Sequence, residues 1–352
     1  MKKNKIILIG GIRKGKEPIC GETMKNQLFI KRFSELFDKV IAIDTYNWKK
    51  RPWCLIEIFF ILLFNRKAKV IISASGASRY LIHFLYKIPL NKKVYFWVVG
   101  GNLSIGIKKG RYNFNALKNL KHIVVQGTSM VDDLLNFGLT NGVYIPNSKP
   151  IDYIPSLRLY KEFDIFRFVF LSRIHPDKGI KEIFEAIKIL DNQGLKNNYS
   201  LDFYGKIDND FNNDFNYLLA NCDNVEYKGF LNLSNTKNYN LLSNYDCMLF
   251  PTYWSGEGFP GVVIDANISG IPIIATDWNL NKTIIKQGLT GSIIPIHDSM
   301  ALALEMIKYI KGDYNVNTMK SNCVDFAKQF DFRKVLSEEV LRNIELYDNK
   351  SF

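Results

Sequence analysis

Cysteine and histidine are scarce in this chain of 352 residues, which has five of the first and four of the second. The cysteines are widely spaced, with no C-x-x-C pair and no histidine in ligand register, so we expect free thiols in a reducing compartment and no metal site. No G-x-G-x-x-G motif follows the first strand-like segment, which argues against a dinucleotide-dependent oxidoreductase. The N-terminal apolar run is too brief for a secretion signal, and we therefore expect a cytoplasmic protein.

Acidic residues are scarce in the first 150 residues, which carry 26 Lys and Arg against 8 Asp and Glu, a formal charge of +18. The remaining residues carry 21 against 26, a formal charge of −5. The cations are scattered among apolar stretches without zinc-finger spacing or an RNP-like strand, so nucleic acid is not an expected partner. An anionic membrane surface fits this charge better, and we expect the basic N-terminal domain to make peripheral contact with one.

A long hydrophobic run is also missing, because the most apolar block, WKKRPWCLIEIFFILLFNRK at residues 48–67, is short. Its most apolar part, residues 54–64, has eleven residues, about half of the roughly 20 that a bilayer-spanning helix needs. Two interpretations remain open: a helix buried in the first domain, or a helix lying in the membrane interface. Hydrophobicity on all sides of the helix favours burial.

Strand-like and helix-like segments alternate along the first half of the chain, which predicts a doubly wound α/β domain over residues 1–150. The predicted strands are residues 5–11, 40–44, 69–76, 93–101, 122–127 and 143–147, and the predicted helices include 23–37 and 129–137. A linker is expected at residues 150–156. The architecture repeats in residues 151–330, and residues 331–352 are expected to form a C-terminal helix.

The glycine-rich segment GEGFPGVVIDA, residues 256–266, places two carboxylates, Glu257 and Asp265, eight residues apart in a strand-turn-helix pattern. If the helix starts near Glu257, eight residues bring Asp265 to within about 80° of its direction, so both acids can border one cleft. The free N–H groups of such a helix start attract phosphate or hydroxyl oxygens. The alternative is that Glu257 caps the helix and Asp265 is a solvated or paired side chain.

Positive charge comes from FRFVFLSRIHPDKGI, residues 166–180, where a predicted strand leads through a loop to a helix at residues 180–190. Arg173 and Lys178 therefore lie at the carboxyl edge of the strand, where ligands bind in open α/β sheets. A guanidinium fork and a compact ammonium group can share a diphosphate. The alternative is a pair of surface cations flanking a turn.

The triplet Asp208, Asn209 and Asp210 resembles a metal motif, but we interpret it as a helix cap or loop.

The two segments together resemble the nucleotide-sugar-dependent glycosyltransferases of the GT-B fold. The resemblance is to the large retaining group often numbered family 4 (glycosyltransferase group 1), of the bacterial surface-polysaccharide type. It covers most of residues 165–310 and includes the intervening segments LDFYG (201–205), NVEYKGF (224–230) and YDCMLFPT (245–252). The second acid of the motif is usually Glu in that group, whereas this chain has Asp265, one methylene shorter.

The resemblance implies an α/β protein with two Rossmann-like doubly wound domains facing each other across a cleft. Residues 1–150 would bind the acceptor and 151–330 the donor, with the last helix crossing back to the first domain. No cofactor or metal is implied, because the nucleoside-diphosphate sugar is a co-substrate and retention in that group needs no enzymic nucleophile. Implied catalytic residues are Arg173 and Lys178 at the diphosphate and Glu257 at the sugar; implied donor-binding residues are Gly258, Phe259, Asp265 (ribose), Gly229, Phe230 (base) and Gly205.

The acceptor side is less well marked. Gly10 and Gly11 can shape an acceptor loop, although a tight strand-to-helix turn explains them equally well. Many relatives have a histidine after the strand that corresponds to residues 94–99, where this chain has Gly100, Gly101 and Asn102, with Asn102 as the nearest polar side chain.

We therefore expect a retaining transferase (EC 2.4) that moves a hexose-type sugar to a saccharide, with a polyprenyl-diphosphate-linked acceptor suggested by the basic domain. Its place would be surface polysaccharide, O-antigen or capsule biosynthesis, in the cytoplasm at the inner face of the cell membrane. The alternatives are a phosphorylase or epimerase of the same fold, or a non-catalytic nucleotide-sugar-binding protein.

Overall fold

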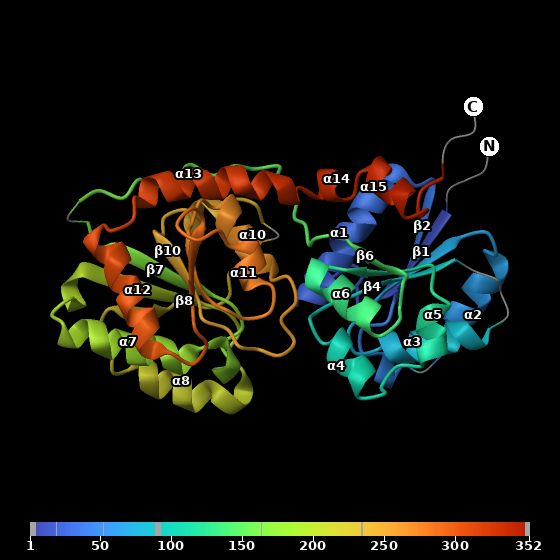
Figure 1. Cartoon of the computed structure of the whole chain (residues 1–352), viewed down its shortest axis with the longest axis horizontal. Coiled ribbons are helices and arrows are strands. Elements are labelled where there is room, and N and C mark those ends of the chain that lie inside the picture. Colours follow the sequence, from blue (N-terminus) through green and yellow to red (C-terminus); the bar gives the residue numbers. More distant parts are fainter. Residues whose placement is uncertain are drawn as a thin grey trace. The chain divides into compact units, whose positions relative to one another are not determined.

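The computed structural model describes residues 5–18, 20–51, 53–88, 93–162, 164–233 and 235–348. It divides into two compact units, shown in Figure 1. Unit 1 combines the residues up to 148 with those from 332 onward, and unit 2 comprises residues 149–331. Each unit is built around its own parallel sheet and its own apolar core.

The sheet of unit 1 has the strand order β2-β1-β3-β4-β5-β6 within the described residues, and all pairs are parallel. Runs of β-branched and other apolar residues form its central strands, as expected for a parallel sheet covered on both faces. The strands are β1 (Lys5–Gly10), β2 (Lys39–Asp44), β3 (Lys69–Ser73), β4 (Val94–Trp97), β5 (His122–Val125) and β6 (Gly142–Tyr144). The helices in the N-terminal part of unit 1 are α1 (Gly21–Leu36), α2 (Cys54–Phe64), α3 (Ser78–Lys87), α4 (Leu103–Lys108), α5 (Phe114–Lys118) and α6 (Thr128–Asn136).

Helix α2 is buried along only one of its faces. Cys54, Ile58 and Leu62, spaced four residues apart, are buried. Ile56 and Phe60, on the other side of the helix, are exposed. Burial, the interpretation favoured for residues 54–64, thus holds for one stripe of the helix only, because the unit supplies neighbours for that stripe alone. Pro52, within the apolar block of residues 48–67, lies outside the described residues.

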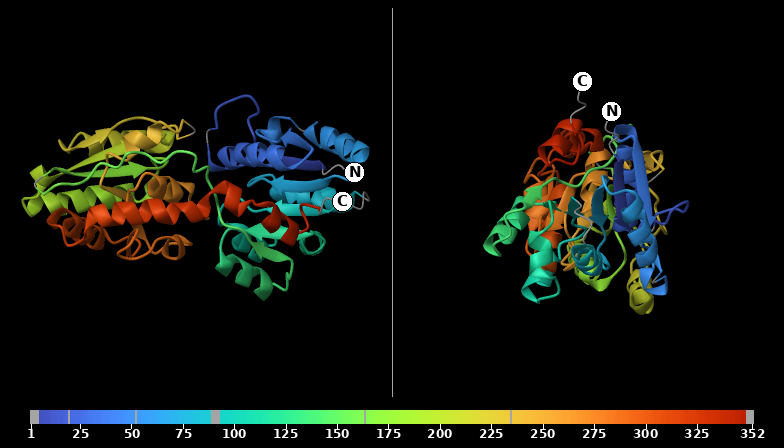
Figure 2. Two further views of the ribbon diagram at one scale, coloured as in Figure 1. Left: turned by 90° about the horizontal axis from the view of Figure 1, so that it is seen from above. Right: turned by 90° about the vertical axis from the view of Figure 1, so that its right-hand side faces the viewer.

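The C-terminal segment packs into the core of unit 1. After α13 (Val316–Ala327) the chain, coloured red in Figure 2, continues into α14 (Phe332–Val335) and α15 (Glu338–Asn343). Leu336, Leu341 and Leu346 are buried among side chains of the unit 1 sheet and α1. The single helix expected for residues 331–352 is instead two short helices separated at Leu336 and Ser337, and residues 349–352 lie outside the described residues.

The sheet of unit 2 has the order β12-β11-β10-β7-β8-β9, again with parallel pairs in the described part of the chain. Helix α7 packs beside α12, and α10 beside α13 (Figure 1). The strands are β7 (Phe166–Leu171), β8 (Tyr199–Tyr204), β9 (Val225–Tyr227), β10 (Cys247–Phe250), β11 (Ile273–Thr276) and β12 (Gly291–Ile294). The helices are α7 (Ile180–Asn192), α8 (Asn212–Leu219), α9 (Asn238–Leu242), α10 (Gly261–Ile268), α11 (Asn281–Ile284), α12 (Ser299–Lys311) and α13 (Val316–Ala327).

The predicted fold class is confirmed, since both units are doubly wound, Rossmann-like α/β structures. Some predicted strands are too long, since those at residues 69–76, 93–101 and 143–147 end three or four residues earlier, at Ser73, Trp97 and Tyr144. Helix α1, expected from residue 23, begins at Gly21 because Cys20 and Thr23 bond to each other's backbone at the helix start.

Candidate functional site

The strand order of unit 2 reverses between β7 and β10. From β7 the chain proceeds outward through β8 to β9, and then returns to pair β10 with the other side of β7. Loops that leave the carboxyl ends of two such strands diverge and open a crevice, which is where open α/β sheets bind ligands. The loop after β7 carries Arg173 and Lys178, and the loop after β10 carries Glu257.

Lys178 and Glu257 meet at this point. The Lys178 ammonium contacts Oε2 of Glu257, and Lys178 is only 6% exposed. Thr252 Oγ1 lies 3.4 Å from the same carboxylate oxygen. The Glu257 loop is fixed from behind, since Asn279 donates to its carbonyl at 2.8 Å and its own N–H donates to Trp254 O at 3.0 Å. Two charges 79 residues apart in the sequence are thus held together before any ligand binds.

Arg173 lies against an aromatic ring that the sequence did not single out. Its guanidinium carbon is 4.5 Å from the centroid of the Trp254 ring, a cation–π arrangement. His175 contacts the same ring edge to face at 4.9 Å, and Asp208 lies 3.8 Å from both Arg173 Nη1 and His175 Nε2. Stacking orients the guanidinium fork, so less side-chain freedom is lost when it binds an anion. The position of Trp254, directly before the glycine-rich turn, was the available sequence signal.

Asp208 precedes a short 3₁₀ helix, as expected for a cap or loop, although its side chain faces Arg173 instead of capping that helix. Within the described residues, no group of three or more His, Cys, Asp and Glu side chains is arranged to hold a metal ion.

Gly205 and Gly229 follow β8 and β9 at the same edge of the sheet. Gly205 has φ of +154°, and a Cβ there would lie 1.7 Å from the carbonyl oxygen of Ser172, the residue before Arg173. Gly205 N–H donates to Gly229 O at 2.9 Å, and Tyr227 donates to Gly205 O at 2.8 Å. The glycine allows the β8 loop to support the Arg173 backbone. Phe230, next to Gly229, is exposed.

Gly258 and Phe259 lie in the turn that leads into α10, but the Phe259 side chain points into the unit. Phe259 is buried and its ring contacts that of Phe330 at 5.3 Å. Helix α10 begins at Gly261 with Pro260 as its N-cap, so Glu257 lies four residues outside the helix. The rotation argument that directed both acids to one cleft therefore does not apply, because the segment from Glu257 to Pro260 is not helical.

Asp265 has partners of its own. It is 5% exposed, accepts a hydrogen bond from Tyr239 at 2.7 Å and lies 3.0 Å from the Lys149 ammonium. Burial, reinforced by the negative charge of Asp265, raises the pKa of Tyr239 well above its usual value. The alternative interpretation of a paired side chain thus describes the contacts of Asp265. No sequence pattern indicated Lys149, which lies in an extended segment without a motif.

The candidate acceptor residues lie in unit 1 at the carboxyl ends of β1 and β4. A Cβ on Gly10 would lie 2.1 Å from Ser73 O, and Gly11 N–H donates to Glu22 Oε1 at 3.0 Å. A Cβ on Gly11 would lie 2.7 Å from Glu22 Oε1, so close packing explains both glycines. The alternative of a tight strand-to-helix turn is wrong, because ten residues separate the end of β1 from the start of α1. Asn102 is exposed and precedes α4.

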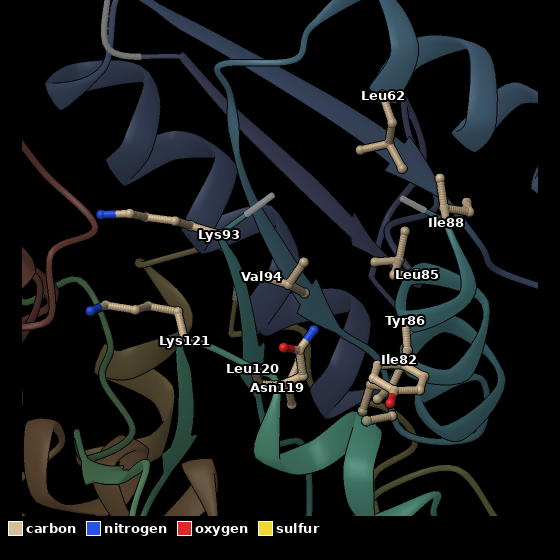
Figure 3. A pocket seen from close by; sticks show the side chains of 11 residues that line it. Leu62, Ile82, Leu85, Tyr86, Ile88, Lys93, Val94, Asn119, Leu120 and Lys121 are labelled. Atoms are coloured by element: carbon tan, nitrogen blue, oxygen red, sulfur yellow. The ribbon is translucent and has the colours of Figure 1, made fainter. Parts of the chain in front are cut away.

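A cavity of about 350 Å³ lies in unit 1 at the opposite end of the strands (Figure 3). Its apolar wall includes Leu62, Leu85 and Val94, the first residue of β4. Lys93 and Lys121 lie at its border with their ammonium groups directed away from that wall, and both pair with Glu345. Because the cavity is at the amino ends of the strands, it lacks the position typical of ligand sites in this fold.

Comparison with known proteins finds similarity mainly in the second unit. Residues 160–329 match the family described as "Glycosyl transferases group 1". The capsular polysaccharide biosynthesis glycosyltransferase CapM of Staphylococcus aureus is 26% identical over 58% of this chain and 53% of its own length. The UDP-Gal:alpha-D-GlcNAc-diphosphoundecaprenol alpha-1,3-galactosyltransferase of Escherichia coli is 26% identical over 45% of this chain and 40% of its own length. The matches thus span about half or less of these relatives.

Among solved structures, the sucrose-phosphate synthase of Thermosynechococcus elongatus superimposes with a TM-score of 0.78, covering 97% of this chain and 99% of that one at 13% identity. At this identity the similarity concerns the fold alone, and it confirms the predicted GT-B fold.

Proposed function

Residues 160–329 form a domain of the glycosyl transferases group 1 family, and on this premise we propose that the chain transfers a sugar from a nucleoside diphosphate to a saccharide acceptor. The observation that carries the proposal is the Lys178–Glu257 pair at the strand-order reversal of unit 2, with Arg173 stacked on Trp254 beside it. This edge presents two cations and one carboxylate, which matches a diphosphate joined to a polyhydroxylated sugar.

In the proposed complex, Arg173 and Lys178 bind the diphosphate oxygens. Lys178 has three N–H donors, so its ammonium can keep Glu257 and still donate to phosphate. Glu257 accepts hydrogen bonds from the hydroxyls of the transferred sugar, with the backbone N–H groups of Gly258 and Phe259 beside it. Asp265 accepts from the ribose and the turn at Gly229 and Phe230 lies beside the base, so the donor occupies the carboxyl edge of one sheet.

The proposed reaction retains the anomeric configuration. The bond between the anomeric carbon and the β-phosphate oxygen breaks while the acceptor hydroxyl forms a new bond to that carbon on the same face. The acceptor proton passes to the departing phosphate oxygen, so no protein nucleophile is needed. Negative charge that develops on the leaving diphosphate is stabilised by Arg173 and Lys178, which are already in place and need not reorganise.

The proposed acceptor is a saccharide linked to a polyprenyl diphosphate, as in surface-polysaccharide synthesis. The Escherichia coli relative carries "diphosphoundecaprenol" in the name of its acceptor and "UDP-Gal" in that of its donor, which supports this class of substrates. A cytoplasmic location follows from the same proposal, because nucleoside-diphosphate sugars are its donors.

A two-step experiment tests this function. Thermal unfolding of the full chain is first measured with UDP, GDP and ADP, since ligand at about 100 times its dissociation constant stabilises a protein by about 2.7 kcal/mol. The matching labelled sugar nucleotides are then incubated with lipid-linked saccharide. The expected product is a lengthened acceptor in which the transferred sugar has the same anomeric configuration, α or β, as in the donor. Stabilisation by none of the nucleotides would contradict the donor assignment.

The remaining outcomes separate the alternatives. Sugar 1-phosphate formed only with inorganic phosphate would identify a phosphorylase, and a new nucleotide sugar formed without acceptor would identify an epimerase. Nucleotide binding with no turnover of any donor would identify a non-catalytic binding protein.

A further inference from the structure

Helix α2 presents an apolar surface to solvent. Ile56 is 61% exposed, Phe60 50% and Phe64 80%, while Trp53, directly before the helix, is 57% exposed. At 100° per residue, Ile56 and Phe60 lie about 160° from the direction of the buried Ile58, so they form the outer side of the helix. We call Trp53, Ile56, Phe60 and Phe64 the α2 apolar face. Large apolar side chains gathered on an exposed helix, next to one another, mark an interaction surface.

Basic residues flank the α2 apolar face at both ends. Lys49 and Lys50 before the helix and Arg66 and Lys67 after it are exposed. Glu57 is the acidic residue of α2; it lies in the first turn, about 100° from Ile58 and so at the edge of the apolar face. The charge of the surroundings is also positive, because the first 150 residues carry a formal +18.

This combination fits one kind of partner. We infer that α2 docks unit 1 on an anionic lipid bilayer, with the α2 apolar face inserted at the level of the headgroups and the flanking cations on the lipid phosphates. The helix has eleven residues and is about 16 Å long, half of the roughly 30 Å hydrocarbon core, so it lies in the interface. In the described residues, the structure has no helix that is long and apolar enough to cross a bilayer.

A second copy of the chain fits the face less well. In a two-fold dimer through α2, the apolar faces would meet, but the basic clusters at residues 49–50 and 66–67 would also be brought together. Like charges at an interface are repulsive, whereas anionic headgroups neutralise them. Trp53 at the helix end also suits a bilayer, because tryptophan favours the boundary between headgroups and hydrocarbon.

Docking adds a partner to the proposed function without depending on the donor site. The α2 residues lie in unit 1, and the candidate donor residues lie in unit 2. The inference rests on the proposed function in one respect: docking would hold the enzyme at the membrane, where a lipid-linked acceptor is found. Failure of one proposal therefore leaves the other to be tested separately.

Vesicle flotation with the full chain tests the inference. The chain should float with vesicles of 70% phosphatidylcholine and 30% phosphatidylglycerol, float about tenfold less with pure phosphatidylcholine, and dissociate as salt is raised. Phe60→Glu should lower the partition coefficient by at least about tenfold, because an apolar anchor is replaced by an anion. Leu135→Glu is the matched control, since Leu135 on α6 of the same unit is 51% exposed and lies outside the α2 apolar face.

The cationic contribution is tested with a second pair of variants. Lys49→Gln/Lys67→Gln should reduce flotation on anionic vesicles about tenfold and leave the weak binding to phosphatidylcholine unchanged. Lys188→Gln/Lys311→Gln, the same charge change on exposed positions of unit 2, should have little effect. Circular dichroism of each variant establishes that it is folded.

Three results would overturn the inference. One is no flotation with anionic vesicles; another is equal flotation of Phe60→Glu, Leu135→Glu and the unchanged chain. The third is a dimer in sedimentation without lipid that Phe60→Glu dissociates, which would identify the face as a self-association surface. Arg173→Ala should float normally, so loss of sugar transfer and loss of docking are distinguishable.

Discussion

The ammonium group of Lys149 lies 3.0 Å from the carboxylate of Asp265, and both side chains are buried. A charge removed from water is costly unless a partner of opposite charge and hydrogen bonds replace the solvent. Tyr239 supplies one of these bonds at 2.7 Å. Asp265 therefore has a structural role in unit 2 before any donor binds, and the predicted contact with ribose would use its remaining acceptor capacity.

A pair of variants separates the two roles of Asp265. Asp265→Ala should lower the free energy of unfolding by about 3 kcal/mol, because it leaves the Lys149 ammonium buried without its anion. Asp265→Ala/Lys149→Met should recover part of this loss, since neither charge then remains. If Asp265 also binds ribose, the double variant should bind the preferred nucleoside diphosphate about tenfold more weakly. Recovered stability with unchanged affinity would show that the ribose prediction is wrong.

Arg173→Ala should lower the rate of sugar transfer about 100-fold or more, because the guanidinium is expected to stabilise charge on the leaving diphosphate. The melting temperature should change little, since this side chain is 44% exposed and its contacts are at the surface. Arg167→Ala is the control, an exposed arginine on β7 of the same sheet. Turnover of Arg173→Ala close to that of Arg167→Ala would reject the diphosphate role.

Gly179→Ala should destabilise unit 2 and displace Lys178, the preceding residue. Gly179 has φ of +76°, and a Cβ there would lie 2.3 Å from the carbonyl oxygen of Pro251. Left-handed backbone alone costs alanine about 1–2 kcal/mol, and the steric contact adds to it. Gly194→Ala isolates the backbone effect, because Gly194 has φ of +75° with no neighbouring atom within 4 Å of the added Cβ. Chemical denaturation of both variants measures the difference, and equal losses would contradict the steric argument.

Glu345→Gln should make the stability of unit 1 less dependent on pH in acid. Hydrogen bonds from Lys121 and Lys93 lower the pKa of Glu345 from 4.5 to about 2. A carboxyl whose pKa is lower in the folded state stabilises the fold above pH 4.5, and this contribution is lost as the pH falls toward 2. The group is exposed, so the effect should be small. Denaturation between pH 5 and 2 measures it, with Glu339→Gln on α15 as the control, and parallel curves for both variants would contradict it.

Many of the strands and helices of each unit could be predicted from the sequence, because local patterns determine them. The run KIILIG forms β1 and HIVV forms β5, since uninterrupted apolar and β-branched runs belong to parallel strands covered on both faces. Helix α7 begins at Ile180 as expected, directly after a glycine in the left-handed conformation. Arg173, Lys178 and Glu257 each follow a predicted strand. Their location at one edge of one sheet could therefore be expected, because the carboxyl ends of parallel strands share that edge.

Side-chain contacts were harder to predict, because they join segments that are distant in the sequence. Trp254 beneath Arg173 and Lys149 beside Asp265 belong to no periodic pattern. The two short helices in place of one at the C-terminus have the same origin, since Leu336 turns inward to the unit 1 core at the break between them.

The sequence alone determined the fold class, because it follows from local periodicity. The glycine positions and motif spacing carried the family resemblance, and that resemblance implied the candidate donor residues. Only the tertiary structure decided that Lys178 is paired with Glu257, that Asp265 is buried with Lys149, and that α2 is half exposed. The reason is physical: hydrophobicity predicts which residues can be buried, but the space that neighbouring elements provide determines which of them are.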